Sequence, residues 1–218
     1  MKACSVCRAG LVETAFGPLC GACALQAVLS EERVLIGDYE RFQLLGEGAM
    51  GSVFLAKHID SDEVVALKLA KLELLQEPAG HALFRQQVKL ESALRHPNIL
   101  PVQGSGHHQG RPFVVMPLME GGTLAEPENT ARYAEPAARA RLLLTIARAI
   151  QFAHERGVLH CDLKPENILF DAAWEPRVSD FGLARSLDTA NFPDFLAVQG
   201  GTRGWMSPEQ ASGESLTT

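Results

Sequence analysis

The pattern of hydrophobic and polar positions predicts both strands and helices. Nearly uninterrupted apolar runs at 64–70 and 113–116, and two apolar stretches around the glycines of 44–55, are typical of β-strands. Residues 77–94 and 137–156 instead space their apolar side chains at helical intervals along one face. We therefore predict an α+β fold, with a sheet early in the chain and helices dominating its later part.

A polar loop between two short apolar stretches carries the most informative residues. The stretches 158–159 and 168–170 fit short strands, the loop between them contains Asp162 and Asn167, and Asp180 follows the next apolar pair. Such a loop can aim one carboxylate at a substrate hydroxyl, while carboxylate and amide oxygens are suitable ligands for Mg²⁺ on ATP phosphates. The alternative is an ordinary polar turn between strands.

A glycine-rich turn and a lysine interrupt the apolar strands of the first half. Gly46, Gly48 and Gly51 would let the backbone fold closely over phosphates with its N–H groups inward. A strand rather than a helix follows, which disfavours a dinucleotide-binding fold. Lys68 lies within the apolar run 64–70, and a buried lysine needs a partner or a phosphate. The alternatives are a plain hairpin turn and a lysine that reaches solvent from the end of a strand.

Composition narrows the classes of protein that fit this pattern. The chain has 218 residues, 46% hydrophobic and 21% charged, as in soluble globular proteins. A net charge of −6 gives no indication of binding to nucleic acid or to an anionic membrane. No apolar run approaches the roughly 20 residues of a membrane span, and Glu13 and four cysteines interrupt the region where a signal peptide would be apolar. We expect a cytoplasmic, reducing location.

The four N-terminal cysteines form two C-x-x-C pairs, Cys4 with Cys7 and Cys20 with Cys23. Two tight turns of this kind can direct four thiolates at one centre, which suits structural Zn²⁺ in a zinc ribbon or knuckle over 1–29. A module this small would take its folding free energy from the metal. Two disulfides, which need an oxidising compartment, and a degenerate ribbon without metal are the alternatives.

The loop 160–167 and the triplet Asp180-Phe181-Gly182 together resemble the catalytic loop and the metal-binding triplet of protein kinases. Lys164, two residues after Asp162, is the serine/threonine variant of this pattern. Cys161 stands where the family usually has arginine. The sequence is therefore similar to bacterial, Hanks-type serine/threonine protein kinases, which implies a bilobal fold with an antiparallel-sheet small lobe and a mainly helical large lobe.

The resemblance implies a role for each matching residue. Asp162 would orient the substrate hydroxyl and accept its proton, and Lys164 would neutralise the γ-phosphate in transit. Asn167 and Asp180 would hold Mg²⁺, and Lys68 would hold the α- and β-phosphates of ATP. The residues expected around the nucleotide are Gly46, Gly48, Gly51, Val53, Ala66, Lys68, Gln87, Met116, Pro117, Met119 and Leu169.

Within this set, the resemblance places Val53 and Ala66 against the adenine and Met116 beside it as the gatekeeper. The adenine would bond to the carbonyl of Pro117 and the N–H of Met119. Proline keeps its carbonyl, so the first of these bonds survives the substitution.

Two departures from the family pattern bear on activity. In the family a helix glutamate pairs with the strand lysine, but the matching residue here is Gln87, which can bond to Lys68 without neutralising it. Glu91 lies one turn further on and would substitute if the helix shifts. The second departure, Cys161, removes the usual contact to a phosphorylated activation segment. We therefore predict activity that does not depend on phosphorylation of that segment.

The resemblance covers 38–218. We divide the chain into a zinc-ribbon-like module at 1–29, a linker at 30–37, a small lobe at 38–116 and a partial large lobe at 117–218. Gly201-Thr202 and Ser207-Pro208-Glu209 resemble the substrate-docking loop and closing motif, after which several helices of the family have no counterpart. The sequence predicts either a truncated frame or a partner chain that supplies those helices.

The leading functional hypothesis is transfer of the ATP γ-phosphate to serine and threonine hydroxyls of protein substrates. Gln87 and the missing helices favour instead a non-catalytic nucleotide-binding pseudokinase scaffold. A third hypothesis is an inactive kinase fragment that acts through its zinc module. A small-molecule phosphotransferase of kinase-like fold is disfavoured by Gly201-Thr202 and by Ser207-Pro208-Glu209.

Overall fold

The structure, a computed structural model, describes residues 34–48, 50–76, 78–181, 185–186 and 201–214. The four N-terminal cysteines, and with them the predicted zinc module, lie outside these residues. The described residues form two compact units. Unit 1 contains residues 34–85 and 102–120, and unit 2 contains residues 86–101 and 121–214.

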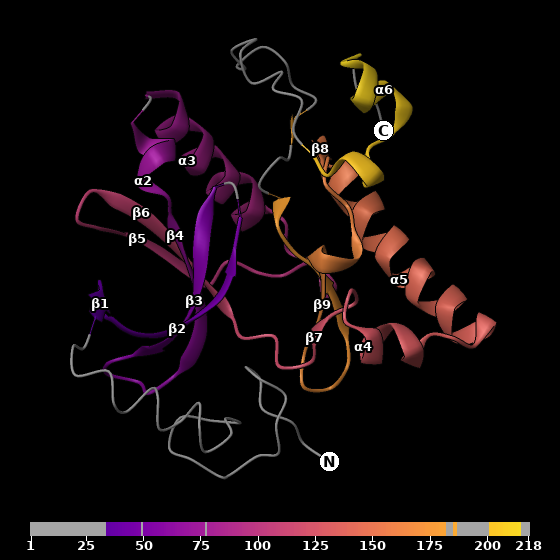
Figure 1. The fold of residues 1–218 in the computed structure, drawn as a ribbon, viewed down its shortest axis with the longest axis horizontal. Helices are drawn as coiled ribbons and strands as arrows, with labels where there is room; N and C mark the ends of the chain where they lie inside the picture. Colours follow the sequence, from indigo (N-terminus) through magenta and orange to yellow (C-terminus); the bar gives the residue numbers. More distant parts are fainter. Residues whose placement is uncertain (1–33, 49, 77, 182–184, 187–200, 215–218) are drawn as a thin grey trace. The chain divides into compact units, whose positions relative to one another are not determined.

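The described part of unit 1 is built on an antiparallel sheet of six strands (Figure 1), in the order β1-β2-β3-β4-β6-β5. The strands predicted at 64–70 and 113–116, and the two on either side of the glycine turn, are confirmed. The strands are β1 Val34–Ile36, β2 Tyr39–Glu47, β3 Gly51–His58, β4 Val64–Ala70, β5 Gly104–His108 and β6 Arg111–Pro117.

The two faces of β4 differ in chemistry. Val65, Leu67 and Leu69 belong to an apolar core to which β1, β3 and β6 contribute Ile36, Ala56, Phe113 and Val115. Because alternate residues of a strand point to opposite faces, Ala66 and Lys68 lie on the face away from this core. The continuous apolar run of β4 therefore covers two different surroundings.

The linker predicted over 30–37 contains a strand. Val34–Ile36 pairs antiparallel with Tyr39–Arg41 across a turn in which Gly37 has a φ of 58°. Ile36 is 1% exposed and belongs to the core of unit 1. The loss of helical spacing in this stretch therefore marks an edge strand rather than an unstructured connection, because three consecutive apolar residues suffice to extend the sheet.

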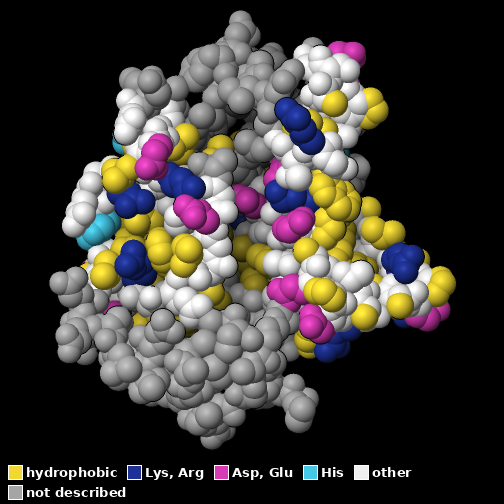
Figure 2. Space-filling view, viewed as in Figure 1, with side chains coloured by type: hydrophobic (Ala, Val, Ile, Leu, Met, Phe, Trp, Pro, Cys, Tyr) yellow, Lys and Arg dark blue, Asp and Glu magenta, His cyan; other side chains and the backbone are white. Residues whose placement is uncertain are grey.

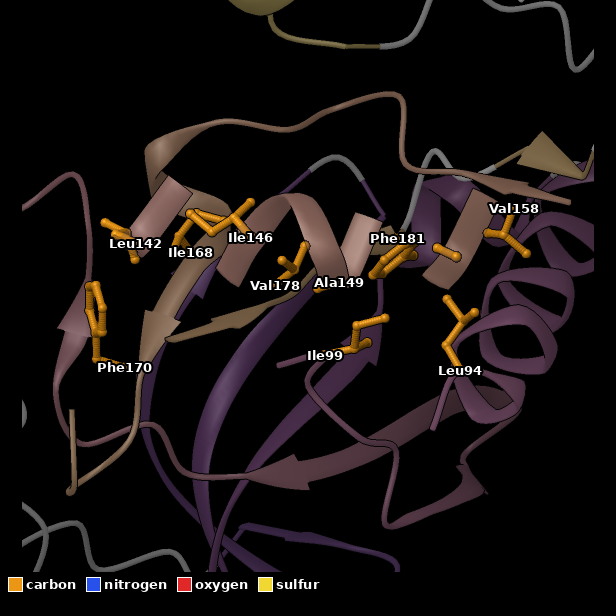
Figure 3. Packing of buried hydrophobic residues seen from close by; sticks show 11 residues of the cluster. Leu94, Ile99, Leu142, Ile146, Ala149, Val158, Ile168, Phe170, Val178 and Phe181 are labelled. Carbon is orange, nitrogen blue, oxygen red and sulfur yellow. The ribbon is translucent and has the colours of Figure 1, made fainter. Parts of the chain in front are cut away.

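Helix α5, Pro136–His154, confirms the helix predicted at 137–156 and organises the core of unit 2. The carboxylate of Glu135 caps its first turn by accepting the N–H of Ala138 at 2.9 Å. Figure 3 shows that apolar side chains of α5 point toward those of the neighbouring strands. The buried residues of this cluster are Leu94, Ile99, Leu142, Ile146, Ala149, Ala153, Val158, Ile168, Phe170, Val178 and Phe181.

Short elements of unit 2 surround this core. The strands predicted at 158–159 and 168–170 are confirmed, and a backbone bridge from Ile99 to Val178 ties the segment after α3 to them. The strands form two small sheets, β10-β9-β7 and β11-β8. The elements are β7 Gly122–Thr123, α4 Pro127–Arg132, β8 Val158–Leu159, η1 Pro165–Asn167, β9 Ile168–Phe170, β10 Pro176–Val178, β11 Arg185–Ser186, η5 Arg203–Trp205 and α6 Pro208–Ser212.

Two helices follow β4 along the chain. The first, α2, is a single turn at Leu72–Leu75, and α3 at Pro78–Ala93 confirms the helix predicted at 77–94. The first half of α3 belongs to unit 1 and the second half to unit 2. The buried polar residues of its second half bear on the candidate site.

Hydrophobic side chains also gather on the surface of unit 2 that Figure 2 shows in yellow. Leu143 and Leu144 of α5 are 58% and 51% exposed. The sequence predicts Leu143 on the buried face of the helix, but the core residues of α5 follow the narrower stripe of Leu142, Ile146 and Ala149. Across the described residues, we find no helix with the length and apolar character that a membrane crossing requires.

Candidate active site

Four predicted nucleotide-binding residues share one face of the sheet in unit 1. Val53 pairs directly with Lys68, and Ala66 pairs directly with Met116, in the register of β3, β4 and β6. Directly paired residues project to the same side of a sheet, so all four lie opposite the apolar core. Lys68 is only 8% exposed. This face combines one buried ammonium group with apolar neighbours, which suits a ligand with a flat apolar part and an anionic part.

The glycines of the turn between β2 and β3 differ in what they do. A Cβ at Gly51 would lie 2.5 Å from the carbonyl oxygen of Leu69, so β3 can approach β4 there only without a side chain. A Cβ at Gly46 would meet no described atom within 4 Å, and one at Gly48 would come within 3.9 Å of the Gly51 carbonyl oxygen. Gly51 is therefore required by strand packing, whereas packing of the described residues does not require the other two.

Three further predicted nucleotide residues are divided between the units. Pro117 is the last residue of β6 and pairs with Val65, and Met119 follows it in unit 1. Leu169 lies in unit 2, on β9 between the buried residues Ile168 and Phe170. Because its neighbours face the core of unit 2, the side chain of Leu169 projects from the opposite side of β9.

Gln87 and Glu91 form a buried pair on α3. The Gln87 side-chain amide donates from Nε2 to Oε1 of Glu91 at 2.9 Å, and the two residues are 3% and 8% exposed. The amide oxygen of Gln87, also buried, has no hydrogen-bond partner among the described residues. A buried carboxylate therefore lies one helical turn after Gln87, and the glutamine is bonded to it.

The carboxylate of Asp162 is surrounded by donors from the docking segment, which we define as residues 201–210. The backbone N–H and the hydroxyl of Thr202 donate to Oδ1 of Asp162 at 2.8 and 2.9 Å. The Lys164 ammonium lies 2.9 Å from Oδ2 and also donates to the Thr202 hydroxyl at 2.7 Å. Charge-assisted bonds of this kind fix the orientation of a carboxylate. The structure therefore brings Asp162, Lys164 and Thr202 together.

The predicted Mg²⁺ ligands lie on adjoining segments. Nδ2 of Asn167 donates to the Asp162 carbonyl at 2.8 Å, which leaves the amide oxygen as the side of Asn167 suited to a cation. The Ser179 N–H donates to the Asn167 carbonyl at 2.9 Å, and Asp180 follows in a left-handed conformation with a φ of 62°. An amide and a carboxylate oxygen fit Mg²⁺, which takes most of its ligands from phosphates and water.

Within the described residues, no cluster of three or more His, Cys, Asp and Glu side chains could hold a metal ion without other ligands.

His160 supports the backbone on both sides of this arrangement. Its Nε2 lies 3.0 Å from the Ser179 carbonyl, and its Nδ1 accepts the N–H of Asp162 at 3.2 Å. Burial lowers the pKa of His160 below its ordinary value of 6.5, so the ring is neutral at pH 7 and donates from Nε2. The ring also lies 4.5 Å from that of Phe181.

Sequence reasoning did not include Thr202, His160 and Gln210 among the site residues. Gln210 donates from Nε2 to the Cys161 carbonyl at 2.6 Å, although 49 positions separate them. The spacing of two residues between His160 and Asp162 in the sequence could have indicated their contact. Nothing in the local sequence indicates the contact of Gln210, because it depends on how the docking segment returns to the loop.

Comparison with known proteins identifies the family. The protein kinase domain matches residues 39–218, so the chain belongs to the protein kinase domain family. It is 33% identical over 183 residues to serine/threonine-protein kinase PknB of Mycobacterium tuberculosis and 32% identical over 182 residues to PknB of Mycobacterium leprae. It is 34% identical over 180 residues to CBL-interacting serine/threonine-protein kinase 5 of Arabidopsis thaliana.

These matches differ in how much of each protein they cover. They include 82% of this chain in all three cases, but 29% of each PknB sequence and 40% of the Arabidopsis protein. The chain thus spans less than half the length of these curated relatives. The family agrees with the one that the loop 160–167 and the triplet at 180–182 predict.

Proposed function

We propose that this chain binds Mg·ATP and transfers the γ-phosphate to serine and threonine hydroxyls of protein substrates. The observation that carries the proposal is the carboxylate of Asp162, held by the Lys164 ammonium at 2.9 Å and by Thr202 at 2.8 Å. A neighbouring positive charge keeps a carboxylate ionised, and the bonds to Thr202 orient it, so it is available to accept a hydroxyl proton close to a transferring phosphoryl group. Membership of the family and the similarity to serine/threonine-protein kinases support the same reaction.

Within the loop, Asp162 would accept the proton of the substrate hydroxyl. Lys164 would place its ammonium group where negative charge lies on the transferred group, and its bond to Thr202 limits its rotamers. Thr202 would align the substrate chain, because its backbone is bonded directly to the base. Each of these roles requires the loop to be rigid before substrate arrives.

In unit 1, Lys68 would hold the α- and β-phosphates and the N–H groups of the turn at Gly46 and Gly48 would hold the other phosphate oxygens. Val53, Ala66 and Met116 would contact the adenine. The carbonyl of Pro117 and the N–H of Met119 would bond to its edge. Leu169 also belongs to the predicted nucleotide set. Packing among the described residues does not explain Gly46 and Gly48, and this supports a ligand at the turn.

Asn167 and Asp180 would hold Mg²⁺. A bound Mg²⁺ ion supplies neutralising charge for the phosphate oxygens. Glu91 would supply the helix carboxylate that the family pattern places at 87, since Gln87 acts as its hydrogen-bond donor at 2.9 Å. On this proposal Glu91 performs the role of the family's helix glutamate, and Gln87 supports Glu91 by a hydrogen bond.

A specific observation favours a second candidate, a nucleotide-binding scaffold without phosphoryl transfer. Gln87 stands where the family has a charged residue, and its amide oxygen is buried without a partner among the described residues. A scaffold would bind Mg·ATP but would not need Asp162. The two candidates therefore separate on a single carboxylate.

The experiment measures transfer of labelled γ-phosphate to a serine and threonine peptide library, with Asp162→Asn and Asp180→Ala as variants. A kinase loses transfer by about 10³-fold in Asp162→Asn while keeping Mg·ATP-induced thermal stabilisation, and Asp180→Ala loses that stabilisation. Stabilisation of the wild type without any transfer would establish the scaffold. If the wild type shows no transfer and no stabilisation by Mg·ATP, both candidates are rejected for this chain.

We further propose that Cys4, Cys7, Cys20 and Cys23 bind one structural Zn²⁺ in a reducing, cytoplasmic environment. The two C-x-x-C motifs support this. The purified chain should contain one equivalent of zinc by elemental analysis, and Cys4→Ser with Cys20→Ser should contain none. If the wild type contains no zinc after preparation under reducing conditions with added zinc, the zinc module is rejected. Loss of the zinc module should leave the Mg·ATP-induced thermal stabilisation unchanged if the module acts separately, for example in docking a protein partner.

A further inference from the structure

A glutamine from α6 holds the peptide bond that precedes Asp162. Gln210 donates from Nε2 to the Cys161 carbonyl at 2.6 Å. The N–H of the same peptide unit, which belongs to Asp162, donates to Nδ1 of His160 at 3.2 Å. Both polar ends of this peptide unit are therefore bonded to side chains, one from the loop itself and one from the docking segment.

Gly201 makes room for the glutamine. A Cβ at this position would lie 2.6 Å from Nε2 of Gln210 and 3.1 Å from the Cys161 carbonyl oxygen. Gly201 also has a φ of 134°, a conformation that residues with a side chain rarely adopt. The docking segment thus packs closely against the catalytic loop, residues 160–167, at the point where Gln210 reaches it.

The backbone of Cys161 needs to be held in place. Its φ is 63°, in the left-handed region, which costs a residue with a side chain about 1 kcal/mol or more. Such conformations persist where surrounding contacts over-determine them. Rotation of the following peptide would carry the Cys161 carbonyl away from Gln210 and the Asp162 N–H away from His160, so the two bonds oppose the same movement.

We propose that Gln210 is a positioning residue that couples the seating of the docking segment to the orientation of the base Asp162. The proposal rests on the proposed kinase function and deepens it. Its contact is to a backbone carbonyl, so the side chain at 161 need not carry charge. When the docking segment is seated, Gln210 locks the 161–162 peptide, and Thr202 from the same segment bonds the Asp162 carboxylate at 2.8 Å. When the segment is not seated, both constraints are absent together.

The test uses Gln210→Ala and Gln210→Glu in the full chain, with Gln151→Ala as the matched control. Gln151 is an exposed glutamine whose amide donates only locally, to Glu155 at 3.2 Å. The expected result is a fall in kcat for peptide phosphorylation of about tenfold in Gln210→Ala. The loss should be at least as large in Gln210→Glu, which places an acceptor against the carbonyl. The KM for ATP, the Mg·ATP thermal shift and the control should not change.

A second variant connects the effect to this contact. Gly201→Ala pushes a methyl group into the position of the Gln210 amide, and it should lower kcat in the same way. Because Gln210→Ala vacates that space, the double variant should lose less than the product of the two single effects. Strict multiplication of the effects would overturn the coupling, as would an unchanged kcat in Gln210→Ala. If Gln210→Ala loses the Mg·ATP thermal shift together with kcat, the role of Gln210 is merely structural.

Hydrogen exchange separates this inference from the proposed function. In wild type the amides of the catalytic loop should exchange slowly, and Gln210→Ala should accelerate the Asp162 amide by about tenfold. If the wild type transfers no phosphate but this acceleration occurs, the kinase proposal fails and the positioning role stands. If transfer occurs and exchange of the Asp162 amide is the same in both proteins, the positioning role fails and the kinase proposal stands.

Discussion

The sheet of unit 1 and the catalytic loop of unit 2 both hold polar groups in buried surroundings, but they do so by different means. In the sheet, Lys68 owes its position to a regular ladder that pairs it with Val53 and Val114. In the loop, Asp162 and Asn167 are held by side-chain bonds to backbone and to one another. The ladder would survive the loss of a single side chain, whereas each bond in the loop depends on one particular residue.

This difference has a physical reason. Backbone ladders satisfy every N–H and C=O without help from side chains, so a strand can present almost any residue on its face. A loop with a left-handed residue such as Cys161 leaves backbone groups that side chains must satisfy. We therefore expect substitutions in the sheet to change the chemistry at one position, and substitutions in the loop to change several positions together.

The largest effect tests the sheet. Lys68→Met retains the apolar stem and the ladder but removes the ammonium group, so we expect kcat/KM for Mg·ATP to fall by about 100-fold or more. The strand pairing of β4 should persist in this variant, because backbone groups make it. Lys57→Met on the neighbouring strand is the control, since Lys57 pairs with the surface residue Asp62. Global unfolding of Lys68→Met in a denaturant titration would contradict the distinction.

A smaller effect tests the buried pair on α3. Gln87→Glu restores the family residue but places a second carboxylate beside Glu91, where the amide now donates at 2.9 Å. We expect a loss of about 2 kcal/mol in the free energy of unfolding from this like-charge contact. The exchange Gln87→Glu with Glu91→Gln should recover most of it, and Lys89→Gln on the exposed side of α3 should change little. Increased stability in urea titration of Gln87→Glu would disprove the pair.

A pH effect of lesser size comes from His96. Burial and the Arg156 guanidinium lower the pKa of His96 below its ordinary value of 6.5. The unfolded chain therefore binds the proton first as pH falls below 6.5, and the folded state loses stability in that window and not above it. Urea titrations between pH about 7.5 and 5.5 should show a smaller decline in His96→Gln than in wild type. Some decline should remain, because the pKa of His160 is lowered in the same direction. If wild type and His96→Gln lose the same free energy of unfolding over this pH range, His96 does not contribute to the pH dependence.

The smallest expected effect concerns phosphorylation. Cys161 offers no charge to a phosphate, and the contacts of the docking segment with Asp162 and Cys161 are made without one. Ser186→Ala combined with Thr189→Ala should leave kcat within about twofold of wild type. Thr202 is not part of this test, because its hydroxyl bonds Asp162 at 2.9 Å. Loss of activity in the double variant, with the protein still folded, would show that a phosphate is needed after all.

The sequence allowed much of the sheet to be predicted and less of the loop. The nearly uninterrupted apolar run 64–70 places Lys68 and Ala66 on a strand, and the structure confirms that strand. The residues of the loop could be identified through motif spacing, but the bond from Gln210 to Cys161 depends on a return of the chain that no local pattern encodes.

Two smaller features show the same limit. The strand Val34–Ile36 is too short for its apolar run to be distinguished from a linker. Gly51 belongs to the glycine pattern in the sequence, yet its requirement arises from the Leu69 carbonyl on the next strand. In both cases the deciding neighbour is distant along the chain.

The role proposed above for Glu91 has a consequence for how such a pair could evolve. Positions one helical turn apart look out over the same surroundings, so an acidic residue can migrate from one to the other over successive generations. The order of the two steps matters. A lineage that gains the second glutamate first passes through an ancestor burdened by repulsion, whereas one that loses the first glutamate early passes through an ancestor without any charge there. Surveys that inspect a single alignment column would count such a lineage as having lost its acidic residue, although its descendants carry that residue four positions along.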